Sequence, residues 1–166
     1  GVMVAASIWS LLIPALEGAA DLGAWSFLPA TIGFWLGILF LLLLDRLVPH
    51  VHLDGEQEGL RASLPRSMMV ALAVALHNLP EGMAVGVVYA GSMQPEQVGS
   101  VSFASAFALA VGIALQNVPE GAIVAMPLRQ AGMSRVKAFT LGMLSGAVEP
   151  LGALLTIGLA AVFAPM

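Results

Sequence analysis

The chain has 166 residues, of which 59% are hydrophobic and only 10% are charged, and its formal net charge is −4. Soluble domains carry about 25% charged residues, so this composition indicates a protein that lies in a membrane. The mild acidity and the lack of a basic patch argue against a nucleic-acid partner. The chain contains no cysteine, which excludes a disulfide framework and any thiolate metal ligand.

Five apolar segments follow one another along the chain. They cover residues 2–16, 27–47, 67–89, 100–128 and 138–163. Spanning a bilayer takes about 20 apolar residues, and only helices or closed barrels satisfy every backbone polar group in lipid. Because these runs are long and do not alternate between apolar and polar residues, they predict an all-α polytopic bundle with five transmembrane helices.

The first apolar segment is short, and the chain opens directly on the apolar residues Gly1, Val2 and Met3. A signal peptide would begin with a basic region, which is absent here. We therefore expect residues 1–166 to form a single transmembrane domain that is a fragment of a longer protein.

The connections between the segments differ in charge. All the basic residues lie in two of them, loops 45–66 and 129–137: Arg46, Arg61, Arg66, Arg129, Arg135 and Lys137. The other two connections contain Glu17, Asp21 and Glu96 and no basic residue. Because five crossings put the two kinds of connection on opposite sides, the positive-inside rule predicts a multi-pass protein of the plasma (inner) membrane whose basic loops are cytoplasmic.

Two near-copies of one string lie on consecutive predicted helices. The third segment contains His77-Asn78-Leu79-Pro80-Glu81-Gly82, and the fourth contains Gln116-Asn117-Val118-Pro119-Glu120-Gly121. Residues three and four apart share one face of a helix, so the polar residues of each string adjoin its glutamate. Consecutive helices are antiparallel, so the repeat predicts an inverted two-fold relation, as in secondary transporters whose sites lie at the membrane midplane.

A third intramembrane glutamate follows in the fifth segment, at Glu149-Pro150. Charge inside a bilayer is costly, so Glu81, Glu120 and Glu149 together constitute a functional hypothesis. The spans contain no lysine or arginine to neutralise them, so three adjacent carboxylates must either be protonated or hold a cation. Oxygen ligands with one imidazole suit a divalent metal, with zinc first and cadmium, iron(II) or manganese as alternatives.

Other interpretations of these residues stay open. Asparagine and glutamine often join membrane helices by hydrogen bonds, which is a purely structural role for Asn78 and Asn117. A proton relay through the glutamates needs no metal. An intramembrane metalloenzyme is a further alternative, but the chain has no His-Glu-x-x-His string, and we predict that it is not an enzyme.

Two groups outside the spans are less specific. One is a run of histidines and acids that either binds metal at the inner mouth or is an ordinary solvated loop: His50, His52, Asp54, Glu56 and Glu58. The other is the pair Glu17 and Asp21, which would concentrate cations at the outer mouth by its negative field.

The two strings, followed by Glu149-Pro150-Leu151-Gly152, resemble the bacterial branch of the ZIP (Zrt/Irt-like) divalent metal transporters. The resemblance covers essentially the whole chain. That family has eight membrane helices, and the resemblance implies that the five segments correspond to its second to sixth. It also suggests a homodimer, and sliding of metal-site helices over residues 67–163 against a scaffold that includes residues 2–47.

The resemblance implies that the protein moves a divalent metal, with zinc as its substrate, toward the cytoplasm through a binuclear mid-membrane site. One metal position would use His77, Glu81, Gln116 and Glu120. The other would use Asn78, Glu81, Asn117, Glu120 and Glu149. Many members have histidine where Gln116 stands, and some bacterial members have aspartate where Asn117 stands, so both departures weaken the ligand set here.

Overall fold

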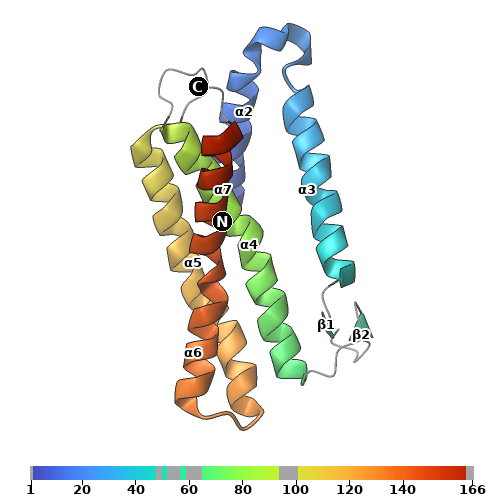
Figure 1. The fold of residues 1–166 in the computed structure, drawn as a ribbon, viewed down its shortest axis with the longest axis vertical. Coiled ribbons are helices and arrows are strands. Elements are labelled where there is room, and N and C mark those ends of the chain that lie inside the picture. Colours follow the sequence, from blue (N-terminus) through green and yellow to red (C-terminus); the bar gives the residue numbers. More distant parts are fainter. Residues whose placement is uncertain (1, 48–49, 52–56, 59–64, 94–100, 164–166) are drawn as a thin grey trace.

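A computed structural model of the chain describes residues 2–47, 50–51, 57–58, 65–93 and 101–163 (Figure 1). Its elements, in chain order, are α1 (Val2–Ala5), the π-helix η1 (Ala6–Leu12), α2 (Ile13–Gly18), the 3-10 helix η2 (Ala20–Trp25), α3 (Leu28–Leu47), β1 (His50–Val51), β2 (Gln57–Glu58), α4 (Arg66–Ser92), α5 (Phe103–Gln130), α6 (Arg135–Gly146) and α7 (Val148–Phe163). The two strands form one antiparallel pair. The predicted all-α membrane helix bundle is confirmed.

Each predicted segment corresponds to helical structure, but the helices differ in length. Three stretches of the described residues are long and apolar enough to cross a membrane: Ser67–Ser92, Phe103–Gln130 and Arg135–Val162. Met3–Gly18 and Leu28–Leu44 are shorter apolar helices. Length and composition therefore identify three of the five predicted crossings, which is sufficient for a multi-pass protein.

The fifth predicted segment is one membrane-length helical stretch, Arg135–Val162, that is interrupted at a single residue. α6 ends at Gly146 and α7 begins at Val148, with Ala147 between them. Pro150 accounts for the interruption, because it has no N–H to donate to the carbonyl of Gly146 and its ring would clash with that carbonyl in a continuous helix. In the first turn of α7 the missing N–H is tolerated. The interruption therefore places Glu149 at the beginning of a helix.

Successive long helices run in alternating directions (Figure 1). α3 and α5 run toward the end of the bundle where β1 and β2 lie, which we call the hairpin end, and α4 and α6 begin there. Five basic residues of the described part of the chain lie at this end: Arg46, Arg66, Arg129, Arg135 and Lys137. Glu17 and Asp21 lie near the opposite end, in α2 and η2. Which end faces the cytoplasm stays a prediction.

Glycines let two pairs of helices approach each other closely. A Cβ atom added at Gly86 of α4 would lie 2.6 Å from the backbone oxygen of Ala153 in α7, and one at Gly152 of α7 would lie 2.8 Å from a backbone oxygen of α4. A Cβ at Gly142 of α6 would lie 2.6 Å from the backbone oxygen of Gly121 in α5. Small residues at helix crossings permit this backbone contact, and it fixes the spacing of α4 with α7 and of α5 with α6.

Two apolar clusters enclose the middle of the bundle. The cluster farther from the hairpin end contains buried residues of η1, α4 and α5: Ala6, Val88, Ala106, Leu109 and Ile113. The cluster nearer the hairpin end contains buried residues of α5 and α6: Val124, Leu128 and Ala138. Along α4 and α5 the two polar strings fall between these clusters. The polar residues therefore form one layer at mid-height, closed off by apolar side chains on both sides.

We expect Gly86→Ala to lower the thermal stability of the protein. The added methyl group would meet the α7 backbone, which cannot move aside as a flexible side chain can, and overpacking of this kind destabilises by about 1–3 kcal/mol. Thermal unfolding in detergent measures the effect. The matched control is Gly91→Ala in the same helix, where an added Cβ has nothing within 4 Å and alanine favours the helix over glycine. Equal unfolding temperatures for the two variants would contradict the proposed contact.

Candidate metal site

Three carboxylates from three helices meet in the polar layer. Glu81 lies on α4, Glu120 on α5 and Glu149 in the first turn of α7. One oxygen from each carboxylate lies within 4.8 Å of the other two. Glu81 and Glu149 are buried, with 7% of each exposed, and Glu120 is half-buried. This spacing allows all three groups to contact one cation or two neighbouring cations.

The glycine that follows each string's glutamate makes this meeting possible. A Cβ atom at Gly82 would overlap the backbone carbonyl of Glu149, so only glycine lets α7 begin beside Glu81. At Gly121 an added Cβ would lie 3.3 Å from the backbone oxygen of Gly142 in α6. The first copy of the string thus holds α7 and the second holds α6, one on each side of the helix interruption.

The side chain of Gln116 joins the two glutamates of the repeated strings. Its Nε2 donates to Oε2 of Glu81 over 3.0 Å and to Oε1 of Glu120 over 3.1 Å. His77, the residue at the equivalent place in the other string, has its Nε2 3.7 Å from Oε1 of Glu81, and 66% of its side chain is exposed. The imidazole therefore lies at the edge of the site, and the amide lies between the carboxylates.

Two asparagines present their carbonyl oxygens to the same layer. Asn78 is 1% exposed, and its Nδ2 donates to the backbone oxygen of Ser145 over 3.1 Å. Because the amide nitrogen is held by that backbone group, the oxygen atom Oδ1 points the other way. Asn117 lies beside the Glu149 carboxylate and contacts the position that a Cβ at Gly146 would occupy.

Four buried oxygens of these side chains lack a hydrogen-bond partner among the described residues: Asn78 Oδ1, Asn117 Oδ1, Glu120 Oε2 and Glu149 Oε1. A buried acceptor without a partner typically costs about 1–3 kcal/mol, and more when it is charged. The described lysine and arginine side chains lie at the hairpin end, so they do not neutralise this layer. A cation bound in this layer would supply the missing interaction to each of these oxygens that it contacts.

The structure gathers all seven predicted site residues in or at the edge of this layer: His77, Asn78, Glu81, Gln116, Asn117, Glu120 and Glu149. Their binding of metal stays a prediction. Of the peripheral groups, Glu17 and Asp21 are exposed, and His50 and Glu58 are opposite each other in the strand pair. The predicted loop residues His52, Asp54 and Glu56 lie outside the described residues.

Ser145 was not identified from the sequence, although it is 5% exposed and its backbone oxygen orients Asn78. Its hydroxyl donates to the backbone oxygen of Gly142 over 2.7 Å. The available signal was the run of small residues just before Pro150, which is typical of helices that pack closely in membranes. Every residue has a backbone carbonyl, so the sequence does not indicate that the one of Ser145 accepts a hydrogen bond from Asn78.

A membrane-spanning helix bundle with clustered carboxylates and amides at mid-height is the kind of fold that carries small ions through a bilayer. The sequence profile of the family described as "ZIP Zinc transporter" matches residues 52–165. The chain therefore belongs to the ZIP zinc transporter family, and the family predicted from the repeated strings is confirmed. This is a family of transporters rather than enzymes, which supports the prediction that the protein is not an enzyme.

Individual relatives come from bacteria and from animals. The chain is 40% identical to zinc transporter ZupT of Corynebacterium aurimucosum, covering 96% of this chain and 60% of that protein. It is 38% identical to zinc transporter ZIPB of Bordetella bronchiseptica, covering 99% of this chain and 52% of the relative. It is 34% identical to human zinc transporter ZIP11, covering 91% and 66% respectively. The chain thus spans between about half and two thirds of the length of these relatives.

We expect Glu81→Gln to stabilise the metal-free protein and to abolish its stabilisation by zinc. Glutamine removes a carboxylate that, without a cation, must either be protonated or repel its two neighbours, while its oxygen can still accept the hydrogen bond from Gln116. Thermal unfolding with and without zinc measures both effects. Glu17→Gln, an exposed site at one end of the bundle, should leave the zinc-induced shift in place. A Glu81→Gln protein that melts lower and still responds to zinc would contradict the repulsion argument.

Proposed function

We propose that the protein transports a divalent metal ion, with zinc as the first candidate, across the membrane and toward the cytoplasm. The observation that carries the proposal is the group of three intramembrane carboxylates with unpartnered oxygens around them. Carboxylate, amide and imidazole donors suit zinc, and they also suit cadmium, iron(II) and manganese. The relatives' names, each a zinc transporter, favour zinc among these.

We propose two metal positions within the layer, with the ligand sets that the resemblance to the family implies. The first would use His77, Glu81, Gln116 and Glu120, and the second would use Asn78, Glu81, Asn117, Glu120 and Glu149. Glu81 and Glu120 would bridge the ions. Gln116 now points its NH2 group at both glutamates, so its amide must rotate to offer its oxygen to a metal.

Neutral amide ligands serve a carrier because a metal that is held too tightly cannot leave. Three of the seven proposed ligands are amides: Asn78, Gln116 and Asn117. Their neutral carbonyl oxygens would orient the ion without adding negative charge, so the net charge of the site would come from the glutamates alone. Release then requires a modest change in geometry or the protonation of a carboxylate, since metal ligands must be deprotonated.

Release toward one side also requires motion, for which the bundle offers a division. The close contacts of α4 with α7 and α5 with α6 favour residues 67–163 moving as one unit. Residues 2–47 would serve as a scaffold, and α3 packs mainly against α2. Much of α3 is exposed apolar surface, including Phe34 and Trp35, which is compatible with lipid or with the proposed homodimer.

The direction of transport is inferred from the charges at the two ends. The basic residues at the hairpin end would be cytoplasmic by the positive-inside rule. Glu17 and Asp21 would then face outward and attract cations toward the site. A metal-free proton relay through the same glutamates is the remaining alternative, and metal analysis of washed protein separates the two, because a relay protein retains no stoichiometric metal.

We expect Glu81→Ala and Glu120→Ala to reduce zinc uptake into proteoliposomes by at least about tenfold. Each substitution removes a carboxylate that both metal positions share, and one tenfold step corresponds to about 1.4 kcal/mol. A zinc-sensitive dye inside the vesicles reports the initial rate. Thr140→Val, an exposed residue of α6 outside the polar layer, is the control. Uptake that survives both glutamate substitutions at the control rate would refute transport through this site.

We also expect the two metal positions to differ in affinity, with the position that includes His77 binding more tightly. An imidazole is a stronger zinc ligand than a neutral amide. In calorimetric zinc titrations, His77→Ala should weaken the tighter binding event by about tenfold or more, whereas Asn117→Ala should affect the weaker event. A single binding event in the unaltered protein, insensitive to His77→Ala, would speak against this assignment.

A further inference from the structure

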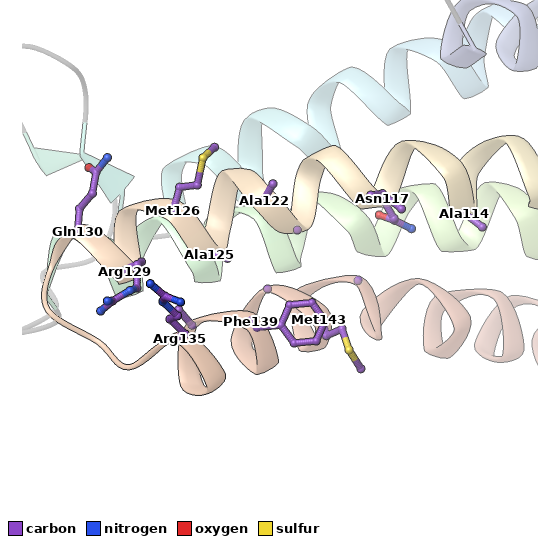
Figure 2. A pocket seen from close by; sticks show the side chains of 15 residues that line it. Ala114, Asn117, Ala122, Ala125, Met126, Arg129, Gln130, Arg135, Phe139 and Met143 are labelled. Carbon is purple, nitrogen blue, oxygen red and sulfur yellow. The ribbon is translucent and has the colours of Figure 1, made fainter.

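A long groove lies on the surface between α5 and α6, with a volume of about 980 Å³ (Figure 2). Its walls are small or apolar side chains, among them Ala122 and Met126 of α5 and Phe139 and Met143 of α6. Along α5 it extends from Ala114 to Gln130, which corresponds to about 24 Å at 1.5 Å per residue. This exceeds the depth of one leaflet, which is roughly half of a 30 Å hydrocarbon core.

The two ends of the groove differ in charge. Arg129 and Arg135 line it at the hairpin end, one on each side of the turn between α5 and α6, and both are exposed (Figure 2). Arg129 donates one N–H to the backbone oxygen of Met133 over 2.8 Å, which holds the side chain at the turn. A guanidinium has five N–H donors, so donors remain for an anion. No carboxylate of the described residues forms an ion pair with either arginine.

We propose that this groove binds one anionic phospholipid, with the phosphate at Arg129 and Arg135 and an acyl chain along the apolar floor. Basic pockets between transmembrane helices at the cytoplasmic side are suited to anionic headgroups. Planar guanidinium groups bind phosphate oxygens through paired hydrogen bonds. The small side chains of the floor leave room for a chain of methylene groups, which would gain van der Waals packing contacts along the groove.

The lining of the groove argues against its being a path for the metal ion. Its walls offer almost no oxygen ligands that could replace the ion's hydration shell. The lining does include Asn117, so the far end of the groove lies next to the proposed metal site. A bound lipid would therefore extend from the basic turn to the neighbourhood of the site without providing a ligand to the metal.

The test is native mass spectrometry of the purified protein after exchange into micelles that contain either phosphatidylglycerol or phosphatidylcholine. We expect one retained phosphatidylglycerol and a clear preference over phosphatidylcholine. Each basic side chain near an anionic headgroup contributes about fivefold, so Arg129→Gln with Arg135→Gln should weaken retention roughly 25-fold. Lys137→Gln is the matched control, because Lys137 lies in the same turn of α6 but does not line the groove.

A second variant tests the apolar part of the groove separately. Ala122→Phe should reduce retention of phosphatidylglycerol although both arginines remain, whereas Ala108→Phe, exposed on α5 outside the groove, should not. If Ala122→Phe fails to fold, the arginine variants decide alone. Equal retention of the two lipids, an equal effect of Lys137→Gln, or a cross-link from Phe139→Cys that places protein in the groove would overturn the proposal. None of these measurements depends on zinc transport.

Discussion

The close approach of the Glu81, Glu120 and Glu149 carboxylates is the constraint on which the rest of the structure depends. When ionised, carboxylates this close inside apolar surroundings repel one another unless a proton or a cation neutralises them. The glycine contacts hold them, because α4 meets α7 and α5 meets α6 through backbone atoms that cannot be pushed apart without losing the packing. A bound cation would convert the same repulsion into attraction, so the layer is costly when empty and favourable when occupied.

Each of the two repeated strings contributes one glutamate and one close helix contact to this packing. In each string the glutamate faces the site, and the preceding amide or imidazole adjoins that glutamate. The glycine after the glutamate lies against the backbone of a neighbouring helix: Gly82 against α7, and Gly121 against α6. α6 and α7 are the two halves of one interrupted segment. The interruption at Ala147 therefore separates the half that contacts the second string from the half that contacts the first.

The parts that followed from the sequence are those that depend on local patterns. Hydropathy predicts the helices, and i,i+3 and i,i+4 spacing predicts which side chains adjoin Glu81 and Glu120. The interruption at Ala147 was not predicted, because a proline in a long apolar run can also lie inside a continuous helix, as Pro80 and Pro119 do. The role of Ser145 was missed because a contact between α4 and α6 depends on how distant segments pack.

The basic turn and the acidic layer impose opposite demands on a metal ion. Guanidinium groups at the hairpin end satisfy the topological preference for positive charge on the cytoplasmic side, but they also raise the electrostatic potential where a cation leaving in that direction must pass. An anionic phosphate held by Arg129 and Arg135 would remove most of that barrier. It would do so without adding a carboxylate that could trap the ion. The proposed lipid and the proposed direction of transport are therefore electrostatically consistent with each other.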